Sequence, residues 1–197
     1  MTAAQFESFW HANYPGSVPL AHLFKFYFRH RWFRIPSISE SKRYPSNKHE
    51  WERILRRQNE IITDLIGNNS NLWGLTGEYG IIEDYEKPQF ITKGLLSQFS
   101  FVELNPIDMH RISEAEFKMG EIYKPFITTL TWQSNKFNDL LKAIAKDDRR
   151  MFFICLSPKC LIAPYDGGID FVLENSQIKN TLERKYKEWM SAKIENL

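Results

Sequence analysis

The sequence is poor in cysteine: Cys155 and Cys160 are the only two among 197 residues. Two cysteines cannot build the framework of several disulfide bridges that stabilises many small secreted domains, so we expect a reducing, cytoplasmic compartment. Both cysteines lie in apolar segments on either side of a short turn, and we predict two buried, reduced thiols. A redox pair is the alternative, but the CxxC spacing typical of such pairs is absent.

The sequence also lacks a strong net charge and a long apolar run. The formal net charge is only +2, whereas nucleic-acid-binding surfaces concentrate lysine and arginine, so a nucleic-acid partner is not expected. No segment approaches the roughly 20 consecutive apolar residues of a membrane helix. The first ten residues have neither the basic start nor the apolar core of a signal peptide. We therefore expect a soluble protein without membrane contacts.

Motifs that identify common enzymes and metal sites are missing as well. The chain has no P-loop, no GxGxxG, no HExxH and no GxSxG motif. Gly74, Gly77 and Gly80 are regularly spaced, but no lysine and no helix pattern follows them, so they indicate turns or a strand bulge. No set of candidate ligands has the spacing of a metal site, and we predict neither a metal nor another cofactor.

What the sequence does have is enough apolar material for a packed core. Hydrophobic residues make up 43% and aromatic residues 15% of the chain, which argues against global disorder. The length fits one domain, and neither a linker nor an internal repeat divides it. We predict a single domain covering residues 1–197.

Strand patterns are clearest in the last third of the chain. Residues 151–156 form an unbroken apolar run, and residues 169–174 alternate along the strand. With residues 160–163 between two turns, they predict a three-stranded meander, followed by a helix that Asn175 or Ser176 opens. Further patterns predict helices over 2–14, 19–28, 47–66 and 134–146, and strands over 32–35, 72–76, 99–104 and 122–132. This order predicts an α+β fold with a mixed or mainly antiparallel sheet and helices packed against it.

The strongest helix pattern covers residues 47–66. Asn47 is a suitable N-cap, and Glu52 and Arg56 have the spacing of a favourable ion pair. The buried stripe is predicted at Trp51, Ile54, Leu55, Ile61, Ile62 and Leu65. Residues 77–97 are predicted to form a loop, with a local helix as the alternative, and Pro125 predicts that its strand is bulged or lies at an edge of the sheet.

Three arginines form the first candidate binding site. Arg29, Arg31 and Arg34 are interleaved with aromatic residues, an arrangement that suits a basic surface on which partner groups stack. The aromatic residues also fit the buried face of a helix, which is the structural alternative.

Asp166 and Asp170 form the second candidate site, because they lie four residues apart across Gly167 and Gly168. Two carboxylates at this spacing could bind a metal or act as an acid pair. We favour a structural interpretation in which Asp166 bonds to the turn backbone, Asp170 faces solvent and the glycines supply positive φ.

One short motif carries a resemblance to a known family. The two strands over 151–163, then Tyr165-Asp166-Gly167-Gly168-Ile169-Asp170 and a helix rich in Lys, Tyr and Trp, resemble an uncharacterised bacterial family of domains of unknown function. That family typically shows Tyr-Asp-Asp-Arg-Gly here. Asp166 matches, whereas Gly167-Gly168 replaces the Asp-Arg part, so no role of that arginine carries over. The resemblance implies an α+β fold and no activity, and small domains of this kind resemble immunity proteins by analogy only.

Two classes of function follow from these observations. The first is a non-enzymatic protein that binds a macromolecule, with another protein as the expected partner and an immunity protein that masks a toxin as one example. The second is an enzyme whose site is assembled from scattered polar residues, namely Glu78, His110, Asp166 and Asp170. The sequence indicates neither the identity of the partner nor the oligomeric state.

Overall fold

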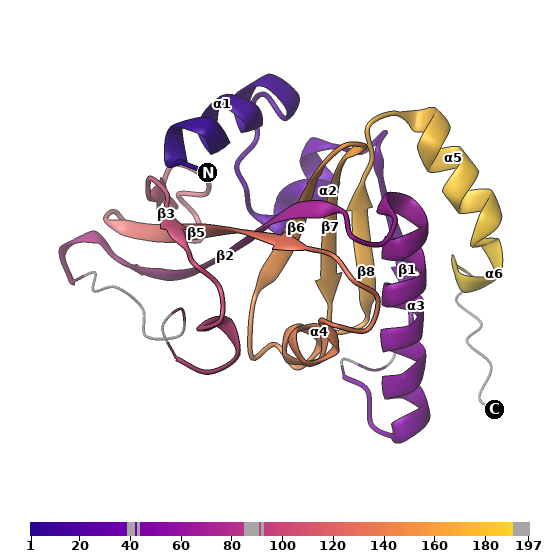
Figure 1. The fold of residues 1–197 in the computed structure, drawn as a ribbon. Helices are drawn as coiled ribbons and strands as arrows, with labels where there is room; N and C mark the ends of the chain where they lie inside the picture. Colours follow the sequence, from indigo (N-terminus) through magenta and orange to yellow (C-terminus); the bar gives the residue numbers. More distant parts are fainter. Residues whose placement is uncertain (39–41, 43, 85–90, 92, 191–197) are drawn as a thin grey trace. The chain divides into compact units, whose positions relative to one another are not determined.

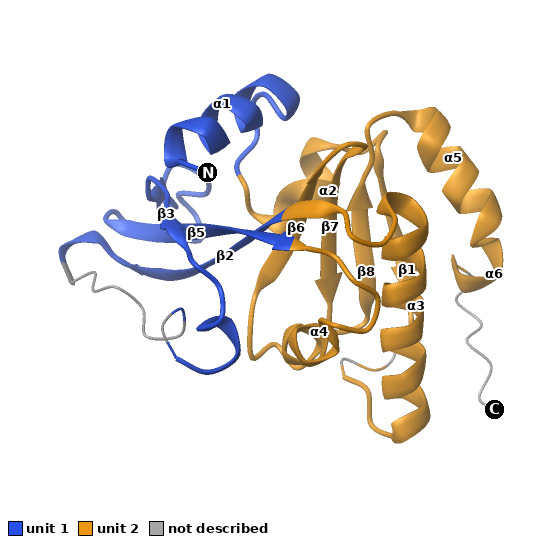
Figure 2. Ribbon diagram, viewed as in Figure 1, with its two compact units in different colours: residues 1–18, 73–130 blue, residues 19–72, 131–197 orange. Residues whose placement is uncertain are grey.

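The computed structural model describes residues 1–38, 42, 44–84, 91 and 93–190. The chain forms two compact units, which Figure 2 shows in different colours: unit 1 holds Met1–Val18 and Trp73–Leu130, and unit 2 holds Pro19–Leu72 and Thr131–Leu197. Each unit combines helices with antiparallel strands, so the predicted α+β class is confirmed. The single domain over residues 1–197 stays a prediction.

Unit 2 contains the predicted C-terminal meander. Its strands are β6 (Met151–Leu156), β7 (Lys159–Tyr165) and β8 (Gly168–Val172), and β1 (Trp32–Pro36) pairs with β8, which gives the order β1-β8-β7-β6. All three pairings are antiparallel. Pro164 does not end β7 as expected, since it lies opposite Ile169 in the ladder. Cys155 and Cys160 are opposite each other, and both are buried free thiols, as predicted.

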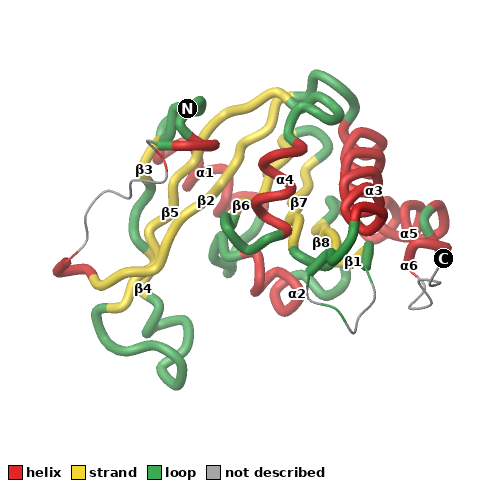
Figure 3. Tube along the Cα trace, turned by 90° about the horizontal axis from the view of Figure 1, so that it is seen from below, coloured by secondary structure: helices red, strands yellow, loops and turns green. Residues whose placement is uncertain are grey.

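Helices cover both faces of this four-stranded part of the sheet. α3 (Lys48–Ile66) and α4 (Asn138–Ala145) lie on one face and α2 (Phe24–Tyr27) on the other, as Figures 1 and 3 show. On the α3 side the rings of Phe33 and Phe171 stack 5.1 Å apart, and on the α2 side Phe24 meets Phe152 edge-on. α5 (Ser176–Lys185) and α6 (Lys187–Met190) both contact β1.

Two predicted helices of unit 2 are shorter than expected. The helix predicted over 19–28 is a 3₁₀ turn, η1 (Ala21–Leu23), followed by the single turn of α2. The helix predicted from Ser134 begins at Asn138, because turns occupy residues 134–137. Asn135 has φ +66°, a left-handed conformation that cannot continue into an α-helix.

The start of α3 is fixed by the N-cap Asn47 and by the carboxylate of Glu50. The Asn47 side chain accepts a hydrogen bond from the main-chain N–H of Glu50, 3.0 Å long. The Glu50 carboxylate in turn accepts from Lys42 Nζ at 2.5 Å and from the main-chain N–H of Ser46 at 2.7 Å. These bonds favour the ionised form and lower the pKa of Glu50 to about 2.

The buried face of α3 differs from the predicted stripe. Ile54, Ile61 and Ile62 are buried as expected, but Trp51, Leu55 and Leu65 are only half-buried. Buried positions are instead taken by the polar residues Gln58 and Asn59. The expected pair of Glu52 with Arg56 is also absent, because Glu52 pairs with Lys48 and Arg56 with Glu60.

Unit 1 is built on a sheet in the order β2-β5-β3, with β4 also paired to β5. Its strands are β2 (Asn71–Ile81), β3 (Val102–Glu103), β4 (Ile107–Asp108) and β5 (Glu121–Thr131), and η2 (Ile82–Asp84) and η4 (Gly94–Leu96) are short 3₁₀ turns. α1 (Ala3–Asn13) has the predicted capping box at Thr2, and its Phe6 and Phe9 rings pack on Trp73 of β2.

Three strand predictions in unit 1 need correction. The loop predicted over 77–97 is wrong for residues 77–81, which continue β2. A Cβ at Gly77 would lie 2.4 Å from the main-chain oxygen of Lys124, so glycine here permits the close approach of the two strands. For the strand that contains Pro125, the edge position is wrong, because β5 lies between β2 and β3, and the alternative of a bulge stays a prediction. The strand predicted over 99–104 shrinks to Val102–Glu103, since its pairing with β5 ends there.

We expect the cap at Glu50 to make folding pH-dependent. Because the pKa of Glu50 is lowered from 4.5 to about 2 in the folded state, its stabilising effect is complete above pH 4.5 and is lost as the pH falls towards 2. Urea unfolding of Glu50→Gln between pH 6 and pH 2.5 should show a smaller loss of stability on acidification than the unchanged protein. Glu188→Gln, at an exposed position on α6, is the control and should keep the full pH dependence. Equal slopes for the unchanged protein and Glu50→Gln would contradict this account.

Candidate functional site

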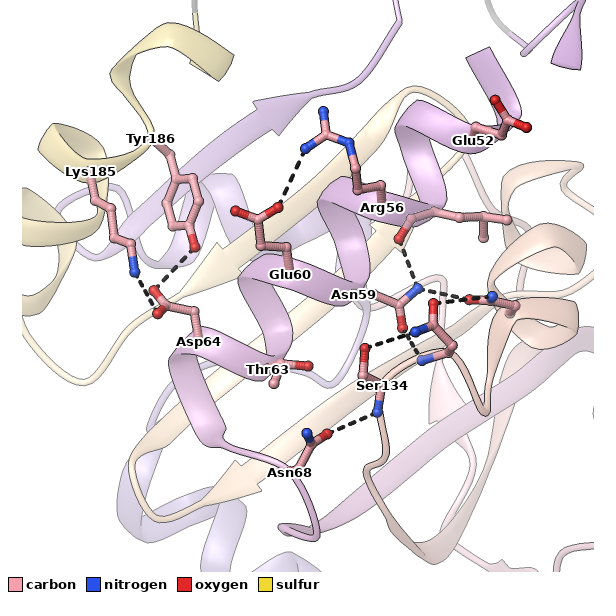
Figure 4. A pocket seen from close by; sticks show the side chains of 13 residues that line it. Glu52, Arg56, Asn59, Glu60, Thr63, Asp64, Asn68, Ser134, Lys185 and Tyr186 are labelled. Carbon is pink, nitrogen blue, oxygen red and sulfur yellow. Dashed lines mark hydrogen bonds and ion pairs between the residues drawn. The ribbon is translucent and has the colours of Figure 1, made fainter. Parts of the chain in front are cut away.

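A groove of about 910 Å³ runs along the outer side of α3 in unit 2 (Figure 4). It lies between the end of α5 on one side and the turn before α4 on the other. Its lining combines carboxylates, cations, amides and hydroxyls with one aliphatic side chain: Glu52, Leu55, Arg56, Asn59, Glu60, Thr63, Asp64, Asn68, Ser134, Asn135, Asn138, Lys185 and Tyr186.

The α5 wall of the groove is held to α3 by Asp64. Its carboxylate accepts from Lys185 Nζ at 2.5 Å and from the Tyr186 hydroxyl at 3.1 Å, and Figure 4 shows the three side chains pointing toward one another. Burial of the phenol raises the pKa of Tyr186, and the charge of Asp64 raises it further. The tyrosine therefore stays a neutral hydrogen-bond donor, and this wall is already ordered in the free protein.

The opposite wall is held to α3 by Asn59. Its amide nitrogen donates to the main-chain oxygen of Leu55 at 2.8 Å and to Asn138 Oδ1 at 2.7 Å. Its amide oxygen accepts from the main-chain N–H of Asn135 at 2.6 Å. One buried amide thus anchors the left-handed residue of the turn and the first residue of α4. The side-chain oxygen of Asn68 adds a further bond to the main-chain N–H of Ser134 at 3.0 Å.

The rest of the groove contains an ion pair and one hydroxyl that accepts a hydrogen bond from a buried side chain. Arg56 and Glu60 form an exposed ion pair 3.4 Å apart. Thr63 Oγ1 accepts from the indole N–H of the buried Trp132 at 3.0 Å. These contacts leave a surface of mixed donors and acceptors with little net charge.

The lining of the groove contains neither of the side chains that most often serve as an activated nucleophile or its base. No histidine or cysteine is among the residues that line it. The Ser134 hydroxyl accepts from the Asn135 amide at 3.3 Å, which is no general base. Within the described part of the chain, no three side chains of histidine, cysteine, aspartate or glutamate are grouped as a metal site.

The structure joins three of the five residues predicted to bind a partner. Arg34 of β1 forms two hydrogen bonds with the Asp170 carboxylate of β8, 2.7 and 2.9 Å long. The hydrogen bond to Asp170 raises the pKa of Arg34, and the charge of Asp166 acts in the same direction. The guanidinium also lies 4.5 Å from the centre of the Tyr165 ring. Arg34, Asp166 and Asp170 therefore form one local cluster.

The expectation that Asp170 faces solvent is wrong. Asp170 is 8% exposed, and its strand position directly opposite Arg34 explains why a carboxylate is tolerated there. The other two predicted arginines do not share this pairing. Arg31 stacks over Phe28 at 5.1 Å, and Arg29 is exposed.

Gly167 and Gly168 do not supply the positive φ that was predicted for them. Positive φ occurs at Gly16, Gly67, Gly94 and Gly120, but not at Gly167 or Gly168. A Cβ at Gly168 would instead lie 2.2 Å from the main-chain oxygen of Ile35. Position 168 requires glycine because β1 lies so close to it that no space is left for a side chain.

The residues named for an enzyme occur in different units. Glu78 and His110 belong to unit 1, and Asp166 and Asp170 belong to unit 2. His110 Nδ1 lies 2.8 Å from the main-chain oxygen of Phe117, a contact that orients the ring. Desolvation raises the pKa of Glu78. Within each unit, these contacts form no pair of a nucleophile and a base.

Comparison with known proteins gives one match. The model of the family described as "Domain of unknown function (DUF3885)" matches residues 20–193. No curated protein and no solved structure matches the chain. The matched range contains the groove and the cluster of Arg34, Asp166 and Asp170, whereas α1 lies before this range. None of the helices in the described part of the chain combines the length and the apolar character needed to cross a membrane.

We expect Asp170→Asn to destabilise the protein. The substitution removes the charge that holds Arg34, and a bidentate hydrogen bond between charged groups contributes about 1–3 kcal/mol. Urea unfolding should therefore show a loss of that size. Arg34→Met should cost more, because it leaves the buried Asp170 carboxylate without its partner, whereas the half-exposed Arg34 can be hydrated in Asp170→Asn. A double-mutant cycle with no coupling between the two positions would contradict the assigned pair.

Proposed function

The chain belongs to the DUF3885 family of domains of unknown function, and we propose that it is a protein-binding domain that holds a segment of its partner in the groove along α3. The observation that carries this proposal is the length of the groove together with walls that are ordered before a ligand arrives. From Glu52 to Asp64 it follows α3 for roughly 18 Å, because an α-helix rises about 1.5 Å per residue. An extended segment of about five or six residues has this length.

The ordered walls favour binding because they lower its entropic cost. The amide of Asn59 and the carboxylate of Asp64 already hold their neighbours in place, so few side chains lose freedom when a ligand enters. The exposed side chains of Glu52, Arg56 and Glu60 still have to be ordered on association. The geometry thus suits a site that recognises shape and hydrogen bonds.

The chemistry of the lining suits a peptide main chain. A peptide offers N–H and C=O groups in alternation, and the groove presents amides, hydroxyls and carboxylates to meet them. Leu55, half-buried in the groove, provides an apolar contact for one side chain. The lining contains Glu52, Glu60 and Asp64 against Arg56 and Lys185, which favours a neutral or weakly basic segment over an acidic one.

The narrower hypothesis of an immunity protein rests on analogy, and nothing in the groove selects a toxin over other proteins. The enzyme hypothesis gains no support from this site, since the groove contains no activated nucleophile.

The proposal can be tested with peptides selected from a random 12-residue display library. We expect the selected peptides to shift the backbone NMR signals of residues along α3 and the 134–138 turn. Glu60→Trp places a bulky ring in the groove at an exposed helix position and should weaken peptide binding by about tenfold or more. Gln177→Trp, at an exposed position on α5 outside the groove lining, is the matched control and should bind normally.

Two outcomes would refute the groove as the binding site. The first is a library that yields no peptide binding above background. The second is a set of peptides whose affinity is the same for Glu60→Trp and for the unchanged protein.

A further inference from the structure

A second feature of α3 lies beside the groove. Arg53, Arg56 and Arg57 project from a single helical turn, and the Trp189 ring of α6 lies against two of them. The ring centre is 5.5 Å from the guanidinium carbon of Arg56 and 5.1 Å from that of Arg57. We call these four residues the arginine cluster. Its aromatic wall keeps two guanidinium groups in fixed planes.

Arg57 is held in place without a carboxylate. One of its terminal nitrogens donates to the main-chain oxygens of Pro36 at 2.6 Å and Trp189 at 3.4 Å. Its Nε is buried and has no hydrogen-bond partner among the residues that the structure describes. An orphaned donor on a charged group is costly, and such groups are usually satisfied in the functional state of a protein.

The positive charges of the cluster are poorly compensated. Burial lowers the pKa of Arg57 to about 10, and repulsion from Arg53 and Arg56 contributes. Arg53 makes no hydrogen bond or ion pair with any residue that the structure describes. The carboxylate paired with Arg56 is Glu60, at 3.4 Å and half-exposed, where water screens the interaction.

We propose that the arginine cluster binds a phosphate monoester through Arg53, Arg56 and Arg57. A monoester carries close to two negative charges at neutral pH and three acceptor oxygens, which match several guanidinium groups. A carboxylate would neutralise only one of them. Because the Nε of Arg57 is buried, its N–H can be satisfied only when the side chain shifts as the ligand binds.

The cluster shares only Arg56 with the peptide groove, and Arg53, Arg57 and Trp189 are not among the residues that line it, so phosphate binding does not require a peptide in the groove. The phosphate can be carried by a small molecule or by a phosphorylated side chain of a protein. Both sources present the same dianionic group, and the experiment separates them.

The test is a titration with inorganic phosphate at constant ionic strength, followed by the arginine Nε–H signals in NMR spectra. Phosphate should shift the signals of Arg53 and Arg57 along a saturable curve, and acetate should not.

Arg53→Gln should weaken phosphate binding by about tenfold, because it removes one charged hydrogen-bond donor without disturbing a structural contact. Arg111→Gln removes an equal charge at an exposed position of unit 1 and should leave binding unchanged.

Further ligands then identify the source of the phosphate. A phosphoserine peptide that binds more tightly than both its unphosphorylated form and a small phosphate ester indicates a protein-borne group, and the reverse order indicates a small molecule. Shifts that never saturate, or equal losses in Arg53→Gln and Arg111→Gln, would overturn the proposal. Glu60→Trp should leave Arg57 still responsive to phosphate, so that failure of the groove and failure of the cluster can be told apart.

Discussion

The buried hydrogen bond from the Gln58 side chain to the main-chain oxygen of Gly168 determines how α3 is rotated on the sheet. It is 2.8 Å long, and Gln58 is completely buried. A buried amide donor must find an acceptor, so the helix cannot turn about its axis without losing this bond. Gly168 is also the residue whose missing side chain lets β1 approach β8. The positions of α3, β8 and β1 are therefore linked through one point.

The rotation of α3 decides which residues become available for binding. With Gln58 inward, Asn59 reaches the turn before α4 and anchors one wall of the groove. Arg56 and Glu60 face outward, and Arg57 lies toward β1 and α6. A helix that buried Trp51, Leu55 and Leu65 fully would hide the groove. The polar residues inside α3 thus reduce its apolar burial and expose a structured outer face.

Features that depend on residues close together in the sequence could be predicted. The caps at Thr2, Asn47 and Asn175 depend on side chains within three residues, and all three form. The meander was predictable because its strands are apolar and its turns are short. The limits of α4 were not, since the left-handed Asn135 is held by Asn59, which is 76 residues away in the chain. Neither the buried roles of Gln58 and Asn59 nor the groove has a signal in apolar periodicity, which counts amides as exposed.

The same limit applies to charge. Sequence spacing suggested that Glu52 would neutralise Arg56. In the structure Glu52 turns to Lys48, and Arg53 and Arg57 receive no carboxylate from the described residues. Along the sequence of α3, positive and negative charges nearly balance. Around the helix axis they are separated, with a groove of mixed charge on one side and a positive cluster on the other. Because Arg56 lies where the two meet, a ligand in either site would alter the charge that the other presents.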